Sequence, residues 1–436
     1  MGRFPVILFE VSLNNRDRPK DMKYLLNRKK NALRLGILGL FLISFAALLH
    51  PPRTSAHIPI TTKIMFDKEV IRILQRNCIE CHRPGGIAFS LASYKDARPW
   101  AKAIEVELLE GRMPPWRPVN GYGDFLNTPK LTQQDMDLVV NWVENGVPEG
   151  DPKDLPKEPL FTNDWKLGKP DLLAEAGPSP LIKPGADEYA SFAVPVDATQ
   201  SRWIRALDLR PGNASIVHCA TFYLTRGGST GQHSEAQLEK LGTWIPGQSP
   251  HLPDNAAWFV PAGSQIVVKI HYKGSDEQSD PPATDTSHVG VYLAPKAPQD
   301  EILVAGVNYP DQMVPVSNAP HRVLATTTLA DSAEVVGIRP LVSPLLASLQ
   351  VTAYKPDGSE EVMLWTDSYT SDWAPDYYLR HPEKLPRGTR LEVVAYLDNS
   401  DDNRNNPNNP ARSLRWADVS SGPLCSFLLA RPESGT

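Results

Sequence analysis

The stretch SQIVVKIHY, residues 264–272, is a short run in which apolar and polar residues largely alternate. Alternation of this kind is typical of a β-strand that buries one face. Similar short runs recur through the C-terminal part of the chain: RWIRALDL (202–209), ASIVHCATFYL (214–224), SHVGVYLA (287–294), SLQVTAY (348–354) and RLEVVAYLDNS (390–400). Turn sequences such as PAGS, PDG and PRGT separate them. The pattern predicts antiparallel β-sandwiches, and a length of about 250 residues predicts two in tandem, over 186–300 and 301–436.

The composition places the chain among ordinary globular proteins. It has 436 residues, of which 41% are hydrophobic and 22% charged, so two to four domains are expected. The net charge is −5, and no basic stripe with interleaved aromatic residues is present, which argues against a nucleic-acid partner. The 42 prolines favour loops, turns and β-structure over long helices.

The N-terminal segment, residues 1–56, has the parts of an export signal. Basic residues precede the apolar run LGILGLFLISFAALL (35–49), and small residues follow it up to Ala56. We predict cleavage near Ala56, with Met22 as a more natural start than Met1. The alternative is an uncleaved anchor, which would be the chain's one attachment to a membrane. Either reading predicts a periplasmic or otherwise exported protein.

The stretch LQRNCIECHRPGG (74–86) contains Cys-x-x-Cys-His, with Cys78, Cys81 and His82. This spacing is the attachment signature of c-type haem, because two thiols bond to the porphyrin and the next imidazole faces the iron. A thioredoxin-like dithiol needs no His at that place, and a zinc site needs a second ligand pair, which does not follow. We therefore predict one covalently bound haem c, with Cys78 and Cys81 as its anchors and His82 as the proximal ligand of the iron.

Met113 in EGRMPPWRP (110–118) is the candidate distal ligand, because a thioether on a proline-stiffened loop suits a His/Met electron carrier. The alternative is that Met113 fills the core. A helix is expected on each side: one leading into the haem motif, and one opening at Thr132 and Asp135, which resemble a capping box, and ending near Gly146. Residues 57–150 therefore resemble a small all-α cytochrome c domain, followed by a linker over 151–185.

The larger C-terminal part resembles the copper type II, ascorbate-dependent monooxygenases, the family of the peptidylglycine hydroxylating and dopamine β-monooxygenases. It is most similar to bacterial members with a cytochrome c domain in front. The resemblance covers roughly 60–430 and rests on the following stretches: MPPW (113–116), IVHCATFYL (216–224), WIPGQSP (244–250), LPDNAAWFVPAGSQIVVKIHY (252–272), VTAYKPDG (351–358) and YLRHPEKLPRGTRLEVVAYLDNSDDNRNNPNNP (378–410). It implies two jelly-roll-like sandwiches, each supplying ligands to one copper.

The resemblance places the first copper at a His-His pair and the His of a His-Tyr strand end. In this chain those positions read His218-Cys219 and His271-Tyr272. Two imidazoles and a thiol would remain, a set that suits copper. The alternatives are that His218 and His271 are polar residues bonded within the cleft, that Cys219 pairs with Cys425 as a disulfide, or that both thiols are free and buried.

The resemblance places the second, catalytic copper at a His-x-His and a Met. Those positions read Leu341-Val342-Ser343 and, in RWADVSSGPLCSFLL (415–429), Leu424 and Cys425. Leu341 and Ser343 cannot hold Cu(I) with an open position. We therefore expect the monooxygenase reaction to be lost and assign no catalytic residue.

The sequence thus predicts a one-electron carrier whose C-terminal scaffold serves docking or structure. Its partners would be redox proteins, or a larger respiratory or dehydrogenase assembly. One alternative is a copper hydroxylase that receives electrons from its own haem. Another is a binding module whose vacant cleft holds a ligand.

Overall fold

The computed structural model describes residues 63–432, except 116–117, 127–130, 160–164, 166, 195–198, 226–237, 249, 251, 254–255, 276–277, 295–299, 368–374 and 421. Residues 63–436 cluster as one compact unit. The predicted export signal lies outside the described residues. Within the part of the chain that is described, no helix is both long and apolar enough to cross a membrane.

The described chain is mainly β, with 42% strand and 15% helix. The strands are β1 (Leu172–Pro178), β2 (Asp187–Val194), β3 (Arg202–Arg210), β4 (Val217–Thr225), β5 (Glu239–Trp244), β6 (Ala256–Val260), β7 (Gln265–Lys273), β8 (Thr286–Leu293), β9 (Asp300–Val307), β10 (Met313–Val314), β11 (His321–Thr328), β12 (Ala333–Pro340), β13 (Leu346–Tyr354), β14 (Glu360–Thr366), β15 (Tyr377–Leu385), β16 (Arg390–Leu397), β17 (Leu414–Arg415) and β18 (Cys425–Pro432). Each run quoted above as a strand lies on one of these, so that local prediction is confirmed.

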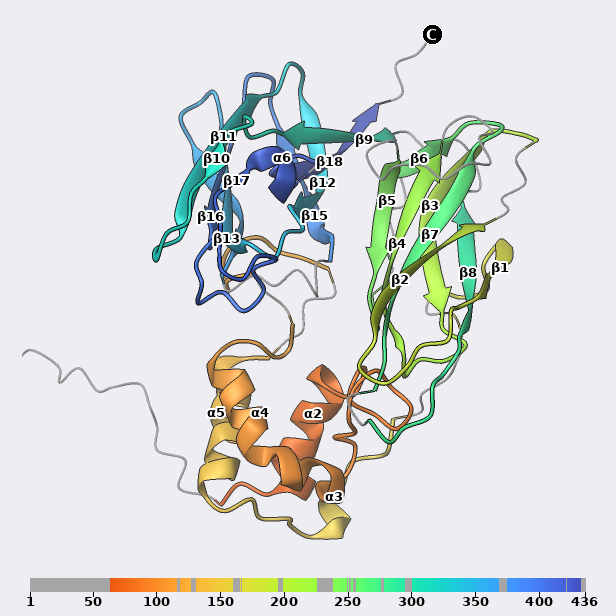
Figure 1. The fold of residues 1–436 in the computed structure, drawn as a ribbon, viewed down its shortest axis with the longest axis vertical. Helices are drawn as coiled ribbons and strands as arrows, with labels where there is room; N and C mark the ends of the chain where they lie inside the picture. The colour runs from red at the N-terminus through yellow and green to blue at the C-terminus, as the bar shows by residue number, and fades with distance from the viewer. Residues whose placement is uncertain are drawn as a thin grey trace, which may run out of the picture. The chain divides into compact units, whose positions relative to one another are not determined.

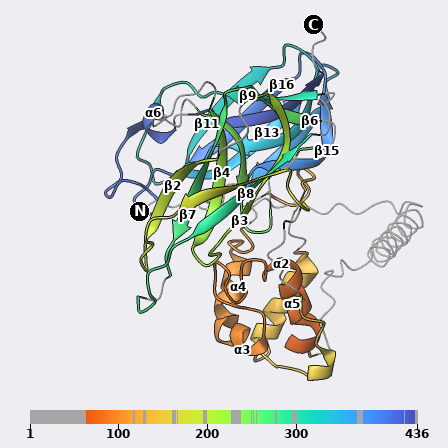
Figure 2. The ribbon, with the colours of Figure 1, turned by 90° about the vertical axis from the view of Figure 1, so that its right-hand side faces the viewer.

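The strands form two groups, β1 to β8 and β9 to β18, which Figure 1 shows apart and which overlap in the turned view of Figure 2. One eight-stranded sheet, in the order β1-β8-β3-β6-β9-β18-β12-β15, runs through both groups. A four-stranded sheet accompanies each: β2-β7-β4-β5 in the first group and β11-β16-β13-β14 in the second. Strand β9 makes the sheet continuous, because it pairs with β6 in parallel and with β18 antiparallel. The two sandwiches therefore share a sheet, a connection that the prediction of two sandwiches in tandem did not include.

Strand β18 is buried on both faces. Phe427 and Leu429 belong to the core of the second sandwich, whereas Leu428 and Ala430 belong to the core of the first. Successive strand residues point to opposite faces, so one strand can supply both cores only where each face is covered. This double burial explains the nearly unbroken apolar run at the C-terminal end of the chain.

The helices are short. They are the π-helical turn η1 (Phe66–Val70), α2 (Ile71–Asn77), α3 (Tyr94–Ala97), the 3₁₀ turn η2 (Arg98–Trp100), α4 (Ala101–Leu109), α5 (Gln133–Glu144), the 3₁₀ turn η3 (Pro152–Asp154) and α6 (Trp416–Val419). The Thr132–Asp135 capping box at the start of α5 is confirmed. Gly146, with φ +85°, follows the helix end, where a left-handed residue closes the last turn. A small apolar cluster around Phe66, Leu74 and Trp142 packs these helices together.

The prediction of a small all-α cytochrome c domain over 57–150 is wrong. The segment 118–126, between α4 and α5, joins the second sandwich: Pro118 bridges to Thr366, and Phe125 bridges to Leu379. Phe125 is 2% exposed and lies in the core of that sandwich. Helical periodicity identified the local helices correctly, but it carries no information about which distant sheet a connecting loop joins.

A buried group of charges joins the first four-stranded sheet to the shared sheet. Asp376, just before β15, is 1% exposed and accepts a hydrogen bond of 2.9 Å from Lys240 Nζ. Arg339 Nε lies 3.1 Å from the same carboxylate. The Arg339 guanidinium also donates to the backbone carbonyls of Lys240 and Leu241, at 2.6 and 2.5 Å. Burial alone raises the pKa of Asp376, but Arg339 and Lys240 outweigh it and hold the pKa below its ordinary value of 3.8.

Replacing Asp376 with Asn should lower the free energy of unfolding by about 3–5 kcal/mol, because the buried Arg339 and the partly buried Lys240 lose their counter-charge. The control is Asp311→Asn, whose partner Arg415 is 67% exposed, and which should cost less than about 1 kcal/mol. Because the folded pKa is depressed, the Asp376 contribution is complete above about pH 4 and is lost as the pH falls further. Urea unfolding at pH 7 and pH 3 measures both effects. Equal losses in the two variants at pH 7 would contradict the prediction.

Candidate functional site

The Cys-x-x-Cys-His stretch forms a tight turn at the end of α2. The backbone N–H of Cys78 donates to the Leu74 carbonyl at 2.8 Å and closes the helix. The N–H groups of Cys81 and His82 then both donate to the Cys78 carbonyl, at 3.2 and 3.0 Å. Ile79, 2% exposed, fixes the turn to the apolar cluster of the helices. The structure therefore brings Cys78, Cys81 and His82 together, half-buried at one surface.

The ring of His82 is oriented by a backbone carbonyl. Its Nδ1 lies 3.0 Å from the Phe89 carbonyl oxygen, to which it donates in the neutral ring. That hydrogen bond leaves Nε2 as the acceptor nitrogen, the arrangement in which imidazole binds a metal. Burial lowers the pKa of His82, partly offset by the bond to Phe89, so the neutral form is favoured. No sequence pattern predicts this partner, since any residue carries a carbonyl.

The two thiols do not have the character of a redox dithiol. Burial, reinforced by the neighbouring Cys81, raises the pKa of Cys78 to about 12. Catalytic dithiols instead depend on a thiolate stabilised well below the ordinary pKa. This contrast weakens the dithiol alternative.

Two exposed aromatic side chains lie beside His82. Phe89 is 42% exposed, with its ring centroid 4.8 Å from that of His82. Trp100, 44% exposed, stacks on Phe89 at 4.1 Å. Exposed aromatic surface next to the imidazole predicted as a ligand would suit a flat, apolar prosthetic group such as haem. Sequence reasoning missed both residues.

Met113 lies in the turn that follows α4. Its backbone N–H donates to the Glu107 carbonyl at 3.2 Å, and the preceding residue, Arg112, donates through its side chain to the Glu107 carboxylate. The side chain of Met113 is half-buried. No hydrogen bond among the described residues joins Met113 to His82, so its role as distal ligand stays a prediction.

The three candidate copper ligands meet on neighbouring strands β4 and β7. The rings of His218 and His271 are 4.9 Å apart, and Cys219 Sγ lies 3.9 Å from His271 Nδ1. A bulge between Val217 and Cys219 disturbs the register and allows adjacent residues to approach the same ring. His271 Nε2 is engaged by Asp187 Oδ1 at 2.6 Å. Across the described part of the chain, no three His, Cys, Asp or Glu side chains are arranged to hold a metal ion.

The positions assigned to the second copper lie in the apolar core of the second sandwich. Leu341, Leu424 and Cys425 all belong to that core, and Ser343 is 1% exposed with its hydroxyl accepting from the Leu345 N–H. Burial raises the pKa of the Cys425 thiol. No disulfide joins Cys219 to Cys425 in the structure.

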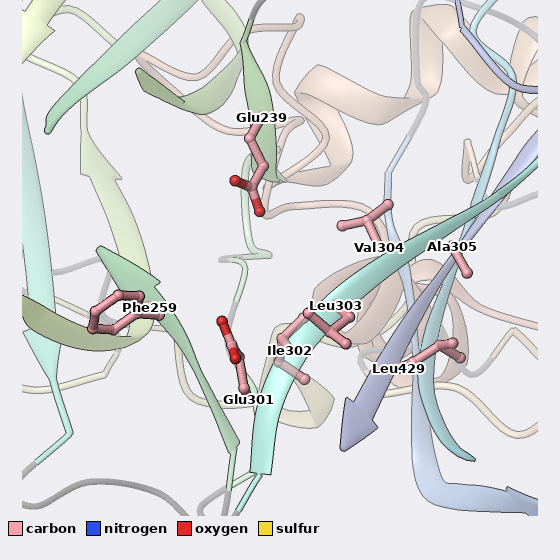
Figure 3. A pocket seen from close by; sticks show the side chains of 8 residues that line it. All are labelled: Glu239, Phe259, Glu301, Ile302, Leu303, Val304, Ala305 and Leu429. Atoms are coloured by element: carbon pink, nitrogen blue, oxygen red, sulfur yellow. The ribbon is translucent and has the colours of Figure 1, made fainter. Parts of the chain in front are cut away.

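A cavity of about 480 Å³ opens where β9 passes from β6 to β18. Figure 3 shows the carboxylates of Glu239 and Glu301 pointing toward the same space. The rest of the lining is apolar: Phe259, Ile302, Leu303, Val304, Ala305 and Leu429. No motif in the sequence pointed to this cavity, and none of its lining residues belongs to the haem or copper candidates.

Comparison with known proteins finds no family model and no curated protein that matches the chain. Among solved structures, PNGF-II is 8% identical over 61% of this chain and 66% of its own length, with a TM-score of 0.25. The PBSX exported protein XepA is 8% identical over 58% of this chain and 93% of its own, with a TM-score of 0.17. Likenesses this weak carry no argument about function.

The resemblance to the copper monooxygenases is overturned, since the described residues are mainly β with short helices and show no small all-α cytochrome c domain. The physical reason lies in the stretches that suggested it. Alternating strand runs and Pro-Asp-Gly turns are what any antiparallel sandwich needs, so they recur without common descent.

Cys425 should resist alkylation in the folded protein, because its side chain is fully buried and its pKa is raised. We expect iodoacetamide at pH 8 to modify it only after denaturation, as peptide mass mapping can measure. Rapid modification under native conditions would show that the core around β18 opens readily.

Proposed function

We propose that this chain is an exported c-type haem protein that transfers single electrons. The observation that supports it most is the conformation of Cys78-x-x-Cys81-His82 at the end of α2, with His82 Nδ1 committed to the Phe89 carbonyl at 3.0 Å. A Cys-x-x-Cys-His sequence alone is a short motif. The same sequence with its imidazole already turned for metal binding is a more specific arrangement.

Each residue at this turn would have its own role in binding the haem. The Cys78 and Cys81 thiols would form thioether bonds and fix the group to the turn. His82 would supply Nε2 to the iron, and the Phe89 carbonyl would hold its tautomer. Phe89 and Trp100 would cover one edge of the porphyrin and lose their exposed surface to it. Haem bound in this way supplies an iron that accepts and releases one electron.

The proposal for the β-rich part is a docking or structural role toward redox proteins, or within a respiratory or dehydrogenase assembly. It rests on the large share of strand in the described chain, 42% against 15% helix. The copper hydroxylase alternative is not retained, because it depended on a family resemblance that the comparisons overturn.

Covalent haem is the direct test. The protein should be exported in a host with c-type haem maturation, denatured, and extracted with acidified organic solvent. We expect the haem to stay with the polypeptide, and to be absent from a Cys78→Ala, Cys81→Ala double variant. Cys219→Ala is the matched thiol control and should keep its haem. Colour that leaves with the solvent would overturn the proposal.

Changing Met113 to Ala should abolish the thioether-to-iron absorption band of the oxidised protein and lower the reduction potential, because a thioether ligand favours the reduced iron. Met313, 53% exposed on β10, provides the control Met313→Ala, which should change neither. A full band in the Met113 variant would assign the distal position to another residue.

A further inference from the structure

The segment 118–126 is held by the second sandwich at two points. Pro118 bridges to Thr366 of β14, which is the edge of the four-stranded sheet, and Phe125 bridges to Leu379 of β15, which is the edge of the eight-stranded sheet. Pro118 suits such a place, because a proline cannot continue a ladder. One short segment thus covers the edges of both sheets that enclose this core.

Backbone hydrogen bonds also attach the segment 118–126 to the second sandwich. Val119 N–H donates to the Trp365 carbonyl at 2.7 Å, and Leu126 N–H donates to the Tyr378 carbonyl at 2.8 Å. From the other side, Arg380 N–H donates to the Asp124 carbonyl at 2.8 Å. These bonds hold the segment near each of its two ends.

Side chains reinforce these bonds. Phe125 is 2% exposed in the core, with its ring 5.5 Å from that of Tyr377. Arg380 Nε lies 3.1 Å from Asp124 Oδ1, and its Nη2 donates to the Phe125 carbonyl at 2.9 Å. The ring of Tyr122 packs edge-on to Trp365 at 5.1 Å.

The backbone at Gly123 lies very close to the second sandwich. Its φ is +75°, which favours glycine, and a Cβ there would lie 2.6 Å from the Met363 carbonyl oxygen and 2.4 Å from the Phe125 ring. The segment is therefore shaped for this surface, and a loop that only passed over the sheets would not need such a fit.

Met113 is confined by this attachment. It precedes Pro118 by five positions, so its Cα lies within about 18 Å of that anchor even with the chain fully extended. On its other side, its N–H is bonded to the Glu107 carbonyl at the end of α4. The loop that carries Met113 is thus tied to a helix at one end and to the second sandwich at the other.

We propose that the second β-sandwich positions the Met113 loop through the strap 118–126, with Phe125 and Arg380 as positioning residues for the distal haem ligand. This inference rests on the proposed function, since it concerns a ligand of the haem. Under this inference, the second sandwich helps to keep Met113 bound to the iron. Loosening the strap lets Met113 leave the iron more often, which opens the distal position.

The test uses the full-length haem protein and four variants. Phe125→Leu and Arg380→Ala loosen the strap. Phe427→Leu is the control for lost core packing, because Phe427 is fully buried in the same core but lies on β18. Arg415→Ala is the control for a lost ion pair, because Arg415 pairs with Asp311 in the same sandwich at 2.7 Å and makes none of the strap's bonds.

Two readouts are measured for each variant. Chymotrypsin cleavage after Tyr122 reports release of the strap without reference to haem. Imidazole binding to the oxidised haem reports the fraction of protein with an open distal position, because apparent affinity scales with the competent fraction. We expect faster cleavage and at least about tenfold tighter imidazole binding in the two strap variants. The two controls should stay near the unaltered protein.

Faster cleavage with unchanged imidazole affinity would overturn the inference while leaving the proposed function intact. Equal changes in all four variants would also overturn it, because they would reflect general loss of stability. Absence of covalent haem from the unaltered protein would overturn the proposed function and this inference together. The two failures are therefore distinguishable.

Discussion

The structure depends on the burial of strands β12 and β18 on both faces. Each supplies alternate side chains to two apolar cores: Val335 and Phe427 to the second, Val336 and Leu428 to the first. Neither sandwich can keep its core without these strands, because removing them would expose one wall of each. The buried Asp376 with Arg339 and Lys240 strengthens the same junction, since its charges come from both sides of it.

This dependence extends to the helical segment. The strap 118–126 is part of the helical segment in sequence but part of the second sandwich in packing, as the 2% exposure of Phe125 shows. A change in the sandwich core near β14 and β15 therefore reaches the loop that carries Met113 through bonded backbone. The short helices and the β-rich part belong to one compact unit over 63–436.

The two candidate sites differ in the contacts that their histidine ring nitrogens make. At the proposed haem-attachment turn, one nitrogen of His82 is used by the Phe89 carbonyl, which leaves Nε2 as the acceptor nitrogen. At the His218–His271 pair, Asp187 already engages His271 Nε2, and the surrounding strands place Tyr189 on its ring at 4.2 Å. That second site has the features of a polar network, because both ring nitrogens of His271 already have partners, Asp187 at Nε2 and Cys219 at Nδ1.

The sequence by itself determined what local chemistry dictates. The Cys78-x-x-Cys81-His82 spacing, the Thr132–Asp135 capping box and the strand runs such as 264–272 all follow from residues a few positions apart. Only the tertiary structure decided the pairing of β9 with both β6 and β18, the seating of Phe125 between two sheet edges, and the meeting of Asp187 with His271. These contacts join residues far apart in the chain. Their partners are often backbone groups, which every residue carries, so no local pattern encodes them.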